Sequence, residues 1–165
     1  MEITKQYIAG FFDGEGSIGI YFNSSKKGCS LRTQLTQNKD IYSTVLMGFL
    51  KENYQGNISE QKTLSGGIKY NWQLNAEKSS LFLQDIEPYL IIKKRQAQLV
   101  ILWQKQRPKR IRDNKGRIAL SKVANRKLDK KISNILKQMK NGMENAKELV
   151  KIEATLKQIL NVKGD

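Results

Sequence analysis

The stretch from Tyr7 to Ile20, YIAGFFDGEGSIGI, constrains the fold most, because its periodicity changes from helical to alternating within a few residues. Residues 4–12 have the spacing of a short helix, and residues 17–23 alternate between apolar and polar side chains as a strand does. Between them, residues 13–16 read Asp-Gly-Glu-Gly, which predicts a tight turn that carries two carboxylates. The chain therefore begins with a helix that leads almost directly into a strand.

Further strands follow. Residues 31–36 alternate, and a helix is expected from Ile41, with Asn38 or Asp40 as its N-cap. Residues 56–62 form a weaker strand pattern, and Gly66-Gly67 suits a hairpin turn. Residues 69–74 alternate most clearly, with one apolar face made by Tyr70, Trp72 and Leu74.

Helices complete the pattern. One capped by Asn75 is expected to end at Pro88, another to span 91–106, and two amphipathic helices to lie near 119–141 and 144–161. Lysines at the start of the 91–106 helix oppose the helix dipole, so an anionic group is expected to compensate them. The order helix, two strands, helix, two strands, helix and further helices predicts an α+β fold with an antiparallel sheet.

The charge is large and unevenly distributed. The chain carries 30 Lys and Arg against 15 Asp and Glu, a formal net charge of +15. Residues 1–92 are neutral, whereas residues 93–131 hold fifteen basic and two acidic side chains. This basic belt predicts contact with nucleic-acid phosphates, and a merely soluble basic surface is the alternative.

Histidine is absent from the sequence, and Cys29 is its one cysteine. This excludes histidine-dependent nucleophiles and bases, zinc sites and an internal disulfide. An enzyme built from this chain must use carboxylates, lysines, hydroxyls or a metal bound through oxygen. The sequence contains neither a membrane-spanning stretch nor a signal-peptide pattern, so we expect a soluble protein inside the cell, in an organelle or a prokaryotic or archaeal cytoplasm.

One face of the predicted sheet is rich in Arg, Gln, Asn and Ser rather than in Glu and Lys. These side chains pair with base edges in the major groove, which a two-stranded ribbon fits. An ordinary solvated face is the alternative. The expected DNA-contacting residues are Ser17, Tyr21, Asn23, Ser30, Arg32, Gln34, Ser59, Gln61, Lys69, Asn71 and Gln73.

The segment IAGFFDGEGSI resembles the signature helix of the LAGLIDADG homing endonucleases, and it occurs once, as in single-motif members. QLTQNKD and PYLIIKKRQAQLV resemble the family's segments at the end of the second strand and at the start of a basic helix. The resemblance implies an αββαββα core with an antiparallel DNA-binding sheet, followed by C-terminal helices. We expect a single domain over residues 1–165, with a core of about 4–106 and a basic helical extension of about 107–165.

The resemblance also implies a site. Glu15 matches the acid that binds divalent metals, and Gly14 matches the position whose carbonyl completes the metal shell. Gln37 and Lys93 match polar pocket residues, so the implied catalytic set is Glu15, Gln37 and Lys93. Ile41 stands where some relatives place an arginine, and Asp13 is expected to be structural. The implied cofactor is Mg²⁺, with Mn²⁺ as a possible substitute and Ca²⁺ as a non-catalytic ion.

Cleavage of a duplex needs two attacks, whereas this chain offers one motif, so two copies must meet. Two glycines spaced four residues apart predict a helix face that a second copy approaches closely. The expected interface residues are Ala9, Gly10, Asp13 and Gly14.

The expected function is that of an intron-encoded, homodimeric, Mg²⁺-dependent endonuclease. It would cut double-stranded DNA at a long near-palindromic site and leave short 3′ overhangs. An RNA-binding intron maturase and a DNA-binding protein that does not cut are the alternatives.

Overall fold

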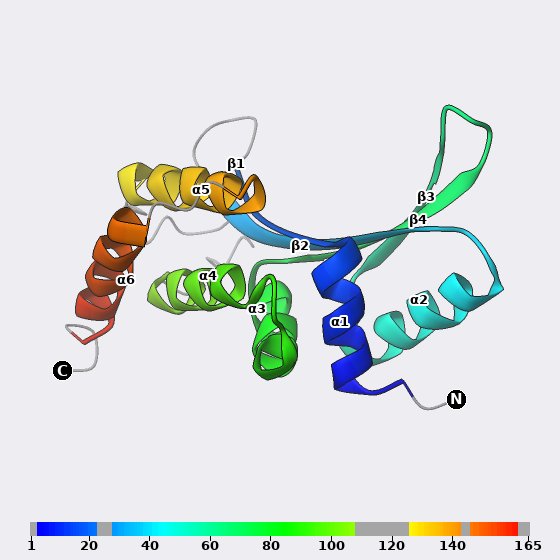
Figure 1. Ribbon diagram of the computed structural model, residues 1–165, viewed down its shortest axis with the longest axis horizontal. Coiled ribbons are helices and arrows are strands. Elements are labelled where there is room, and N and C mark those ends of the chain that lie inside the picture. Colours follow the sequence, from blue (N-terminus) through cyan, green and yellow to red (C-terminus); the bar gives the residue numbers. More distant parts are fainter. Residues whose placement is uncertain (1–2, 23–27, 108–125, 143–145, 162–165) are drawn as a thin grey trace, which may run out of the picture.

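The computed structural model describes residues 3–22, 28–107, 126–142 and 146–161, and its elements follow the predicted order (Figure 1). The core comprises α1 (Lys5–Glu15), β1 (Gly16–Phe22), β2 (Cys29–Asn38), α2 (Ile41–Tyr54), β3 (Asn57–Lys62), β4 (Ile68–Asn75), α3 (Ala76–Ile86), the 3₁₀ turn η1 (Glu87–Tyr89) and α4 (Lys94–Gln106). Helices α5 (Arg126–Lys140) and α6 (Ala146–Asn161) follow. The predicted α+β fold, an αββαββα core with C-terminal helices, is confirmed.

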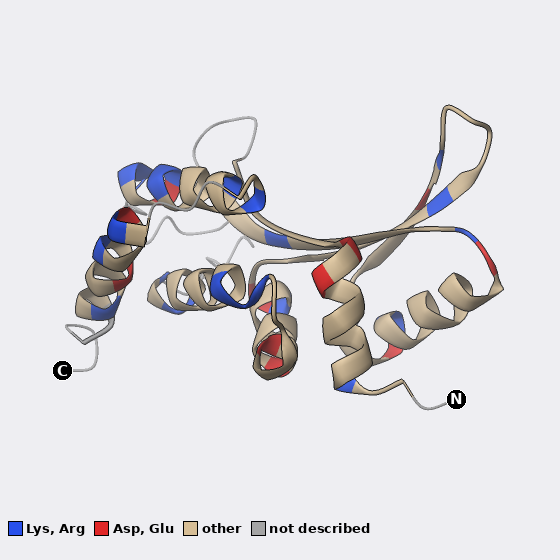
Figure 2. Ribbon diagram, in the orientation of Figure 1, with Lys and Arg blue, Asp and Glu red and all other residues tan. Residues whose placement is uncertain are grey.

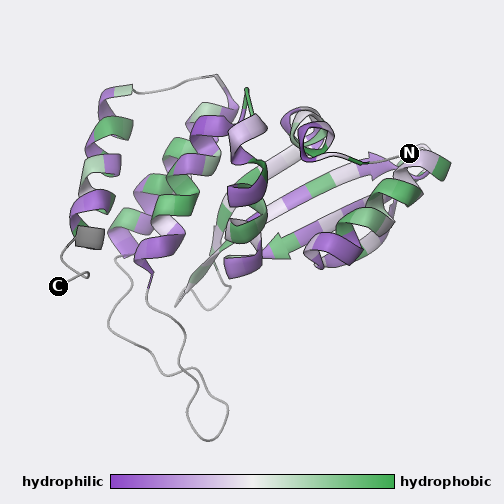
Figure 3. Ribbon diagram, turned by 90° about the horizontal axis from the view of Figure 1, so that it is seen from below, coloured by the Kyte–Doolittle hydropathy of each residue, from purple (hydrophilic) through white to green (hydrophobic). Residues whose placement is uncertain are grey.

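The four strands form one antiparallel sheet in the order β1-β2-β4-β3. Because side chains alternate along each strand, this register places the apolar positions of the two central strands, β2 and β4, on the same face. Leu31, Leu35, Trp72 and Leu74 of that face are almost completely buried. The view from below shows helices in front of this face (Figure 3), and the described helices leave the opposite, polar face uncovered.

Aromatic rings join the elements beneath the sheet. Phe82 of α3 makes edge-to-face contacts with Phe12, Tyr54 and Trp72, at centroid distances of 5.3, 4.9 and 5.0 Å. These contacts connect α1, α2 and β4 through one buried ring, and each adds a fraction of a kcal/mol to about 1.5 kcal/mol beyond area burial. Further along the sheet, α5 packs against β1, where the Ser133 hydroxyl donates to the Ile20 carbonyl at 3.4 Å. The described helices thereby pack against one side of the sheet.

Several predicted boundaries are corrected. Helix α1 continues through Glu15 and strand β1 begins at Gly16, so the predicted turn does not exist. Helix α4 begins at Lys94, three residues later than predicted. The helix predicted to start near 119 is described only from Arg126.

The caps also differ from one another. Asp40 is the N-cap of α2, in a capping box in which the Ser43 amide donates to the Asp40 carboxylate at 2.7 Å. Asn75 stands at the N-cap of α3 but makes no capping bond. Its side-chain oxygen instead accepts from Arg32 and Gln73 on the polar face of the sheet, so the sheet competes successfully for this amide. Among the described helices, none is long and apolar enough to cross a membrane.

Candidate active site and nucleic-acid interface

The predicted metal donors lie at the C-terminal end of α1. Glu15 is the last residue of the helix, is exposed, and makes no hydrogen bond or ion pair to any other described residue. The final carbonyls of a helix, including that of Gly14, lack intrahelical partners and carry the negative end of its dipole. Figure 2 shows acidic residues at this end of α1, beside the sheet. A carboxylate and a carbonyl are hard oxygen donors, and they fit a cation such as Mg²⁺.

Asp13 has a different environment although it is only two residues away. It is 8% exposed, and its carboxylate accepts three successive backbone amides from the segment before α4. The distances are 2.7 Å from Ile91, 3.2 Å from Ile92 and 2.8 Å from Lys93. The anion expected to compensate the basic start of this helix is therefore Asp13, supplied by α1.

Lys93 contacts the same end of α1. Its ammonium donates to the main-chain carbonyl of Asp13. Burial lowers the pKa of Lys93, with a smaller lowering from Lys140, while the negative charges of Asp13 and Glu15 oppose the change. The structure thus brings Lys93 within electrostatic reach of Glu15.

Gln37 lies near the end of β2, two residues beyond Leu35, which pairs with Gly16 at the start of β1. It is half-buried, and its side-chain oxygen accepts from the Asn38 amide at 3.0 Å. Within the described residues it makes no hydrogen bond to Glu15 or Lys93. Ile41, the first residue of α2, is 74% exposed and supplies no polar group.

One copy of the chain offers few metal ligands. In the described ranges, no three Asp, Glu, His or Cys side chains gather into a possible metal site. Glu15 and the Gly14 carbonyl together fall short of the six ligands that Mg²⁺ requires. A Mg²⁺ ion held here would have to take its remaining ligands from water, a substrate or a second copy.

The polar face of the sheet carries a hydrogen-bonded network across three strands. The Tyr21 hydroxyl donates to Gln34, and the Gln34 amide donates to Gln73, both at 3.2 Å. Gln73 and Arg32 both donate to Asn75 at 3.3 Å, and the Arg32 guanidinium lies 4.3 Å from the centre of the Tyr21 ring. These hydrogen bonds fix the orientation of exposed side chains that would otherwise be mobile.

The register places all the described members of the predicted DNA-contacting set on this face. Asn23 lies outside the described residues. Four further polar side chains share the face and were missed, although continuing the alternation to the strand ends identifies them: Thr36, Asn38, Asn57 and Asn75. Asn71 differs from its neighbours, because its buried side-chain oxygen has no hydrogen-bond partner among the described residues.

The exposed side of α1 is flat. Gly10 and Gly14 are exposed, and a Cβ atom built on either would meet nothing within 4 Å. Tyr7 extends this side and stacks on Phe11, with ring centroids 6.2 Å apart. Of the four residues predicted for the interface, Gly10 and Gly14 are exposed in one copy, whereas Ala9 is 0% and Asp13 8% exposed.

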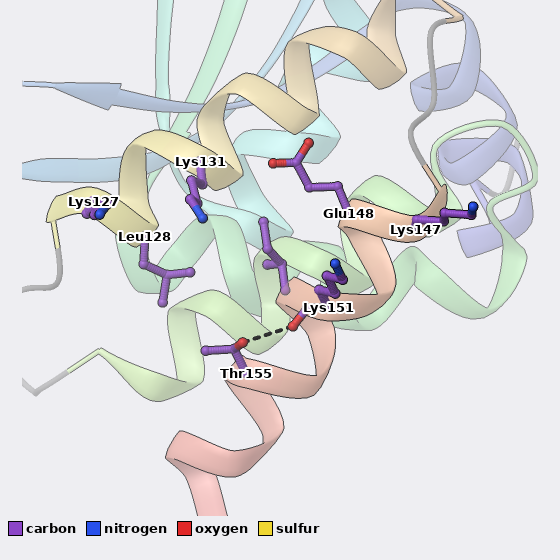
Figure 4. Close-up of a pocket in the computed structure, with 8 residues that line it drawn as sticks. Lys127, Leu128, Lys131, Lys147, Glu148, Lys151 and Thr155 are labelled. Atoms are coloured by element: carbon purple, nitrogen blue, oxygen red, sulfur yellow. Dashed lines mark hydrogen bonds between the residues drawn. The ribbon is translucent and has the colours of Figure 1, made fainter.

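Part of the basic belt lies on the C-terminal helices. Residues 108–125 fall outside the described ranges. Lys127, Leu128 and Lys131 of α5 line a groove together with Lys147, Lys151 and Ile152 of α6. Figure 4 shows the four lysines projecting from these two helices. Among the described residues that line this groove, Glu148 is the one acid against four lysines, so this lining carries a net positive charge.

Solved structures similar to this one are homing endonucleases. I-CvuI in complex with its target in the presence of Ca has a TM-score of 0.54 and 16% sequence identity, over 94% of this chain and 93% of that chain. I-CvuI in complex with an I-CreI target in the presence of Mg, with the DNA not cleaved, gives a TM-score of 0.55 and 14% identity, over 92% and 93%. These likenesses support the fold.

Comparison with curated protein sequences gave no significant match. The model of the LAGLIDADG endonuclease family matches residues 8–106, which include most of α1, the sheet and α4. That match covers more than half of the sequence and the helix end that carries Glu15. The chain therefore belongs to the LAGLIDADG endonuclease family.

Proposed function

We propose that two copies of this chain form a site-specific endonuclease that cuts double-stranded DNA in a divalent-metal-dependent reaction. The target is long and near-palindromic, the products carry short 3′ overhangs, and the gene lies in an intron whose homing the enzyme promotes. All 165 residues form one domain, with the segment after residue 106 as its basic extension. A DNA substrate also implies a soluble enzyme inside the cell, in an organelle or in a prokaryotic or archaeal cytoplasm.

Two neighbouring features carry the proposal: a polar sheet face with ordered side chains, and the exposed carboxylate of Glu15 at one edge of the sheet, to which no other described residue is hydrogen-bonded. The Tyr21–Gln34–Gln73 network and the Arg32–Asn75 hydrogen bond would hold amide and guanidinium groups in position for base edges in the major groove. Glu15 is the last residue of α1, and β1 begins at the next residue. The sheet that would bind the bases therefore adjoins the acid that would lie at the scissile phosphate.

Four residues of the chain would have separate roles in phosphodiester cleavage. Glu15 and the Gly14 carbonyl would hold Mg²⁺, or Mn²⁺ in its place, and Ca²⁺ would bind without supporting cleavage. The metal supplies activation of water and stabilisation of the leaving oxygen. Lys93 offsets negative charge beside Glu15, and the Gln37 amide orients water near the end of β2.

Two features support a dimer: a duplex has two scissile bonds, and α1 has an exposed side that a second copy could approach. Each strand of the duplex needs one catalytic end, and each copy supplies one Glu15. The flat side around Gly10 and Gly14 lets two α1 helices approach about a two-fold axis, which brings both helix ends to the DNA. A two-fold enzyme requires a near-palindromic target.

The test uses DNA that spans the insertion site of the intron, incubated with the purified chain and Mg²⁺ or Ca²⁺. We expect staggered cutting of both strands with Mg²⁺ and binding without cutting with Ca²⁺. Glu15→Gln should keep binding and reduce the cleavage rate constant by roughly 100-fold or more. Asp85→Asn, which changes a carboxylate that pairs with Lys5 away from the site, is the control. A fully active Glu15→Gln variant would disprove the metal assignment.

A further inference from the structure

Asp13 and Lys93 form a reciprocal contact between two helix ends. The Asp13 carboxylate, from the last turn of α1, accepts the amides of Ile91, Ile92 and Lys93 just before α4 begins. In return, the Lys93 ammonium donates to the Asp13 carbonyl at the C-terminal end of α1. Each helix end therefore carries a partial charge that a charged group from the other helix balances.

This arrangement differs from an ordinary helix cap. An N-cap side chain comes from the residue that precedes the helix, but Lys93 at that position makes no side-chain capping bond. The carboxylate comes instead from 78 to 80 residues earlier in the chain. Because α1, which supplies the accepting Asp13, also ends in Gly14 and Glu15, the contact fixes the turn that carries Lys93 against those residues.

Lys93 is held at two points. Its backbone amide is bound by the Asp13 carboxylate, and its side-chain ammonium is bound by the carbonyl of the same residue. Asp13 is 8% exposed, so water does not compete strongly for these bonds. We propose that Asp13 is a positioning residue for DNA cleavage, which acts through Lys93 by holding its ammonium beside Glu15. This inference rests on the proposed endonuclease function.

The test is a double-mutant cycle between Asp13→Asn and Lys93→Met. Single-turnover cleavage with Mg²⁺ and DNA affinity with Ca²⁺ are measured for each variant. We expect Asp13→Asn to reduce the cleavage rate constant by about 10-fold or more and to change the DNA dissociation constant by less than about 3-fold. In the Lys93→Met background, Asp13→Asn should cause no further loss of cleavage, because its effect passes through the ammonium that is already absent.

The matched control is Asp129→Asn. Asp129 is also a buried carboxylate, bonded to the Trp103 indole at 2.7 Å, but it lies on α5. It should lower the melting temperature without a selective loss of cleavage. An Asp13→Asn loss of the same size in both Lys93 backgrounds would overturn the inference. If Asp13→Asn does not fold, the same cycle is measured with Asp13→Glu, which keeps the charge and displaces it.

A second readout does not depend on activity. Hydrogen exchange of the Ile91, Ile92 and Lys93 amides should be slow in the parent chain and faster in Asp13→Asn, with the exchange of β2 and β4 amides unchanged. Unchanged exchange at these three amides would disprove the contact. A parent chain that keeps slow exchange but cuts no DNA would disprove the proposed function and leave the contact standing.

Discussion

The two acids at the end of α1 show how neighbouring residues acquire separate roles. Successive helical residues turn by about 100°, so side chains two apart point to nearly opposite sides. Asp13 faces its own chain and is buried, while Glu15 is exposed beside the sheet. The sequence predicted a structural role for Asp13, because the family motif distinguishes the two positions. It could not identify the partners of Asp13, which lie about eighty residues away and depend on how α1 packs beside η1 and α4.

Cys29 gives a prediction at this scale. It is 2% exposed, its thiol donates to Asp129 at 3.2 Å, and the Arg107 guanidinium donates to its sulfur at 3.0 Å. Burial raises the pKa of the Cys29 thiol to about 11, although Arg107 opposes the shift. The folded chain therefore keeps the neutral thiol at pH values where an unfolded thiol, with a pKa near 8.5, is already ionised.

Because the unfolded state binds fewer protons than the folded state in this range, stability falls as the pH rises from about 8.5 to 11. Cys29→Ala lacks this contribution. We expect the free energy of unfolding, measured by urea titration at several pH values, to fall more steeply for the parent chain. The difference should reach up to about 1.4 kcal/mol per pH unit. Identical slopes for the two chains would contradict the burial of a neutral thiol.

At the scale of elements, the alternation of apolar and polar residues predicted the strands well, whereas the ends of helices were predicted least accurately. The Tyr70, Trp72 and Leu74 face of β4 was predicted because strict alternation of apolar and polar side chains is typical of a half-buried strand. The predicted end of α1 was wrong because Gly14 and Gly16 suggested a turn. In the structure, Phe12 packs against Phe82 and the helix continues to Glu15. A Cβ at Gly16 would lie 2.3 Å from the Phe12 ring, so this glycine allows close packing rather than a flexible turn.

The flat side of α1 gives a prediction for the dimer. Gly10→Leu adds a side chain where the chain itself leaves open space, and leucine favours helix more than glycine does. The fold of one copy should therefore be kept. In a two-fold interface the change occurs twice, so the dimer dissociation constant should rise by at least about 30-fold.

Sedimentation equilibrium and thermal melting distinguish these effects. Ala154→Leu on α6, an exposed helical position away from α1, is the matched control and should leave the association unchanged. A Gly10→Leu chain that dimerises as tightly as the parent would place the interface on another surface. A loss of secondary structure would show instead that α1 needs glycine for its own packing.

At the scale of the whole molecule, much of the basic charge is separated from the polar face of the sheet. The sheet face is polar with few charges, whereas Lys and Arg gather on α5 and α6 (Figure 2). The sequence predicted a basic belt over residues 93–131, but the pairing of Lys127 and Lys131 with Lys147 and Lys151 depends on how α5 and α6 pack. Lysines four residues apart repel one another on a helix, and a bound polyanion relieves that repulsion. Phosphate contact and base reading would therefore be performed by different parts of the chain.

This division predicts a specific response to salt. Replacing Lys147 and Lys151 with Gln removes two charges from the groove without touching the sheet. If the groove binds DNA phosphates, the slope of log affinity against log salt should become shallower by about 0.9 for each phosphate that a copy of the variant no longer neutralises. The affinities for cognate and unrelated DNA should fall by the same factor, because phosphate contacts carry no sequence information.

Lys78→Gln with Lys105→Gln, on α3 and α4, lowers the net charge equally outside the groove and should leave the slope unchanged. An equal change with this control pair would show that net charge alone, and not the groove between α5 and α6, sets the salt dependence.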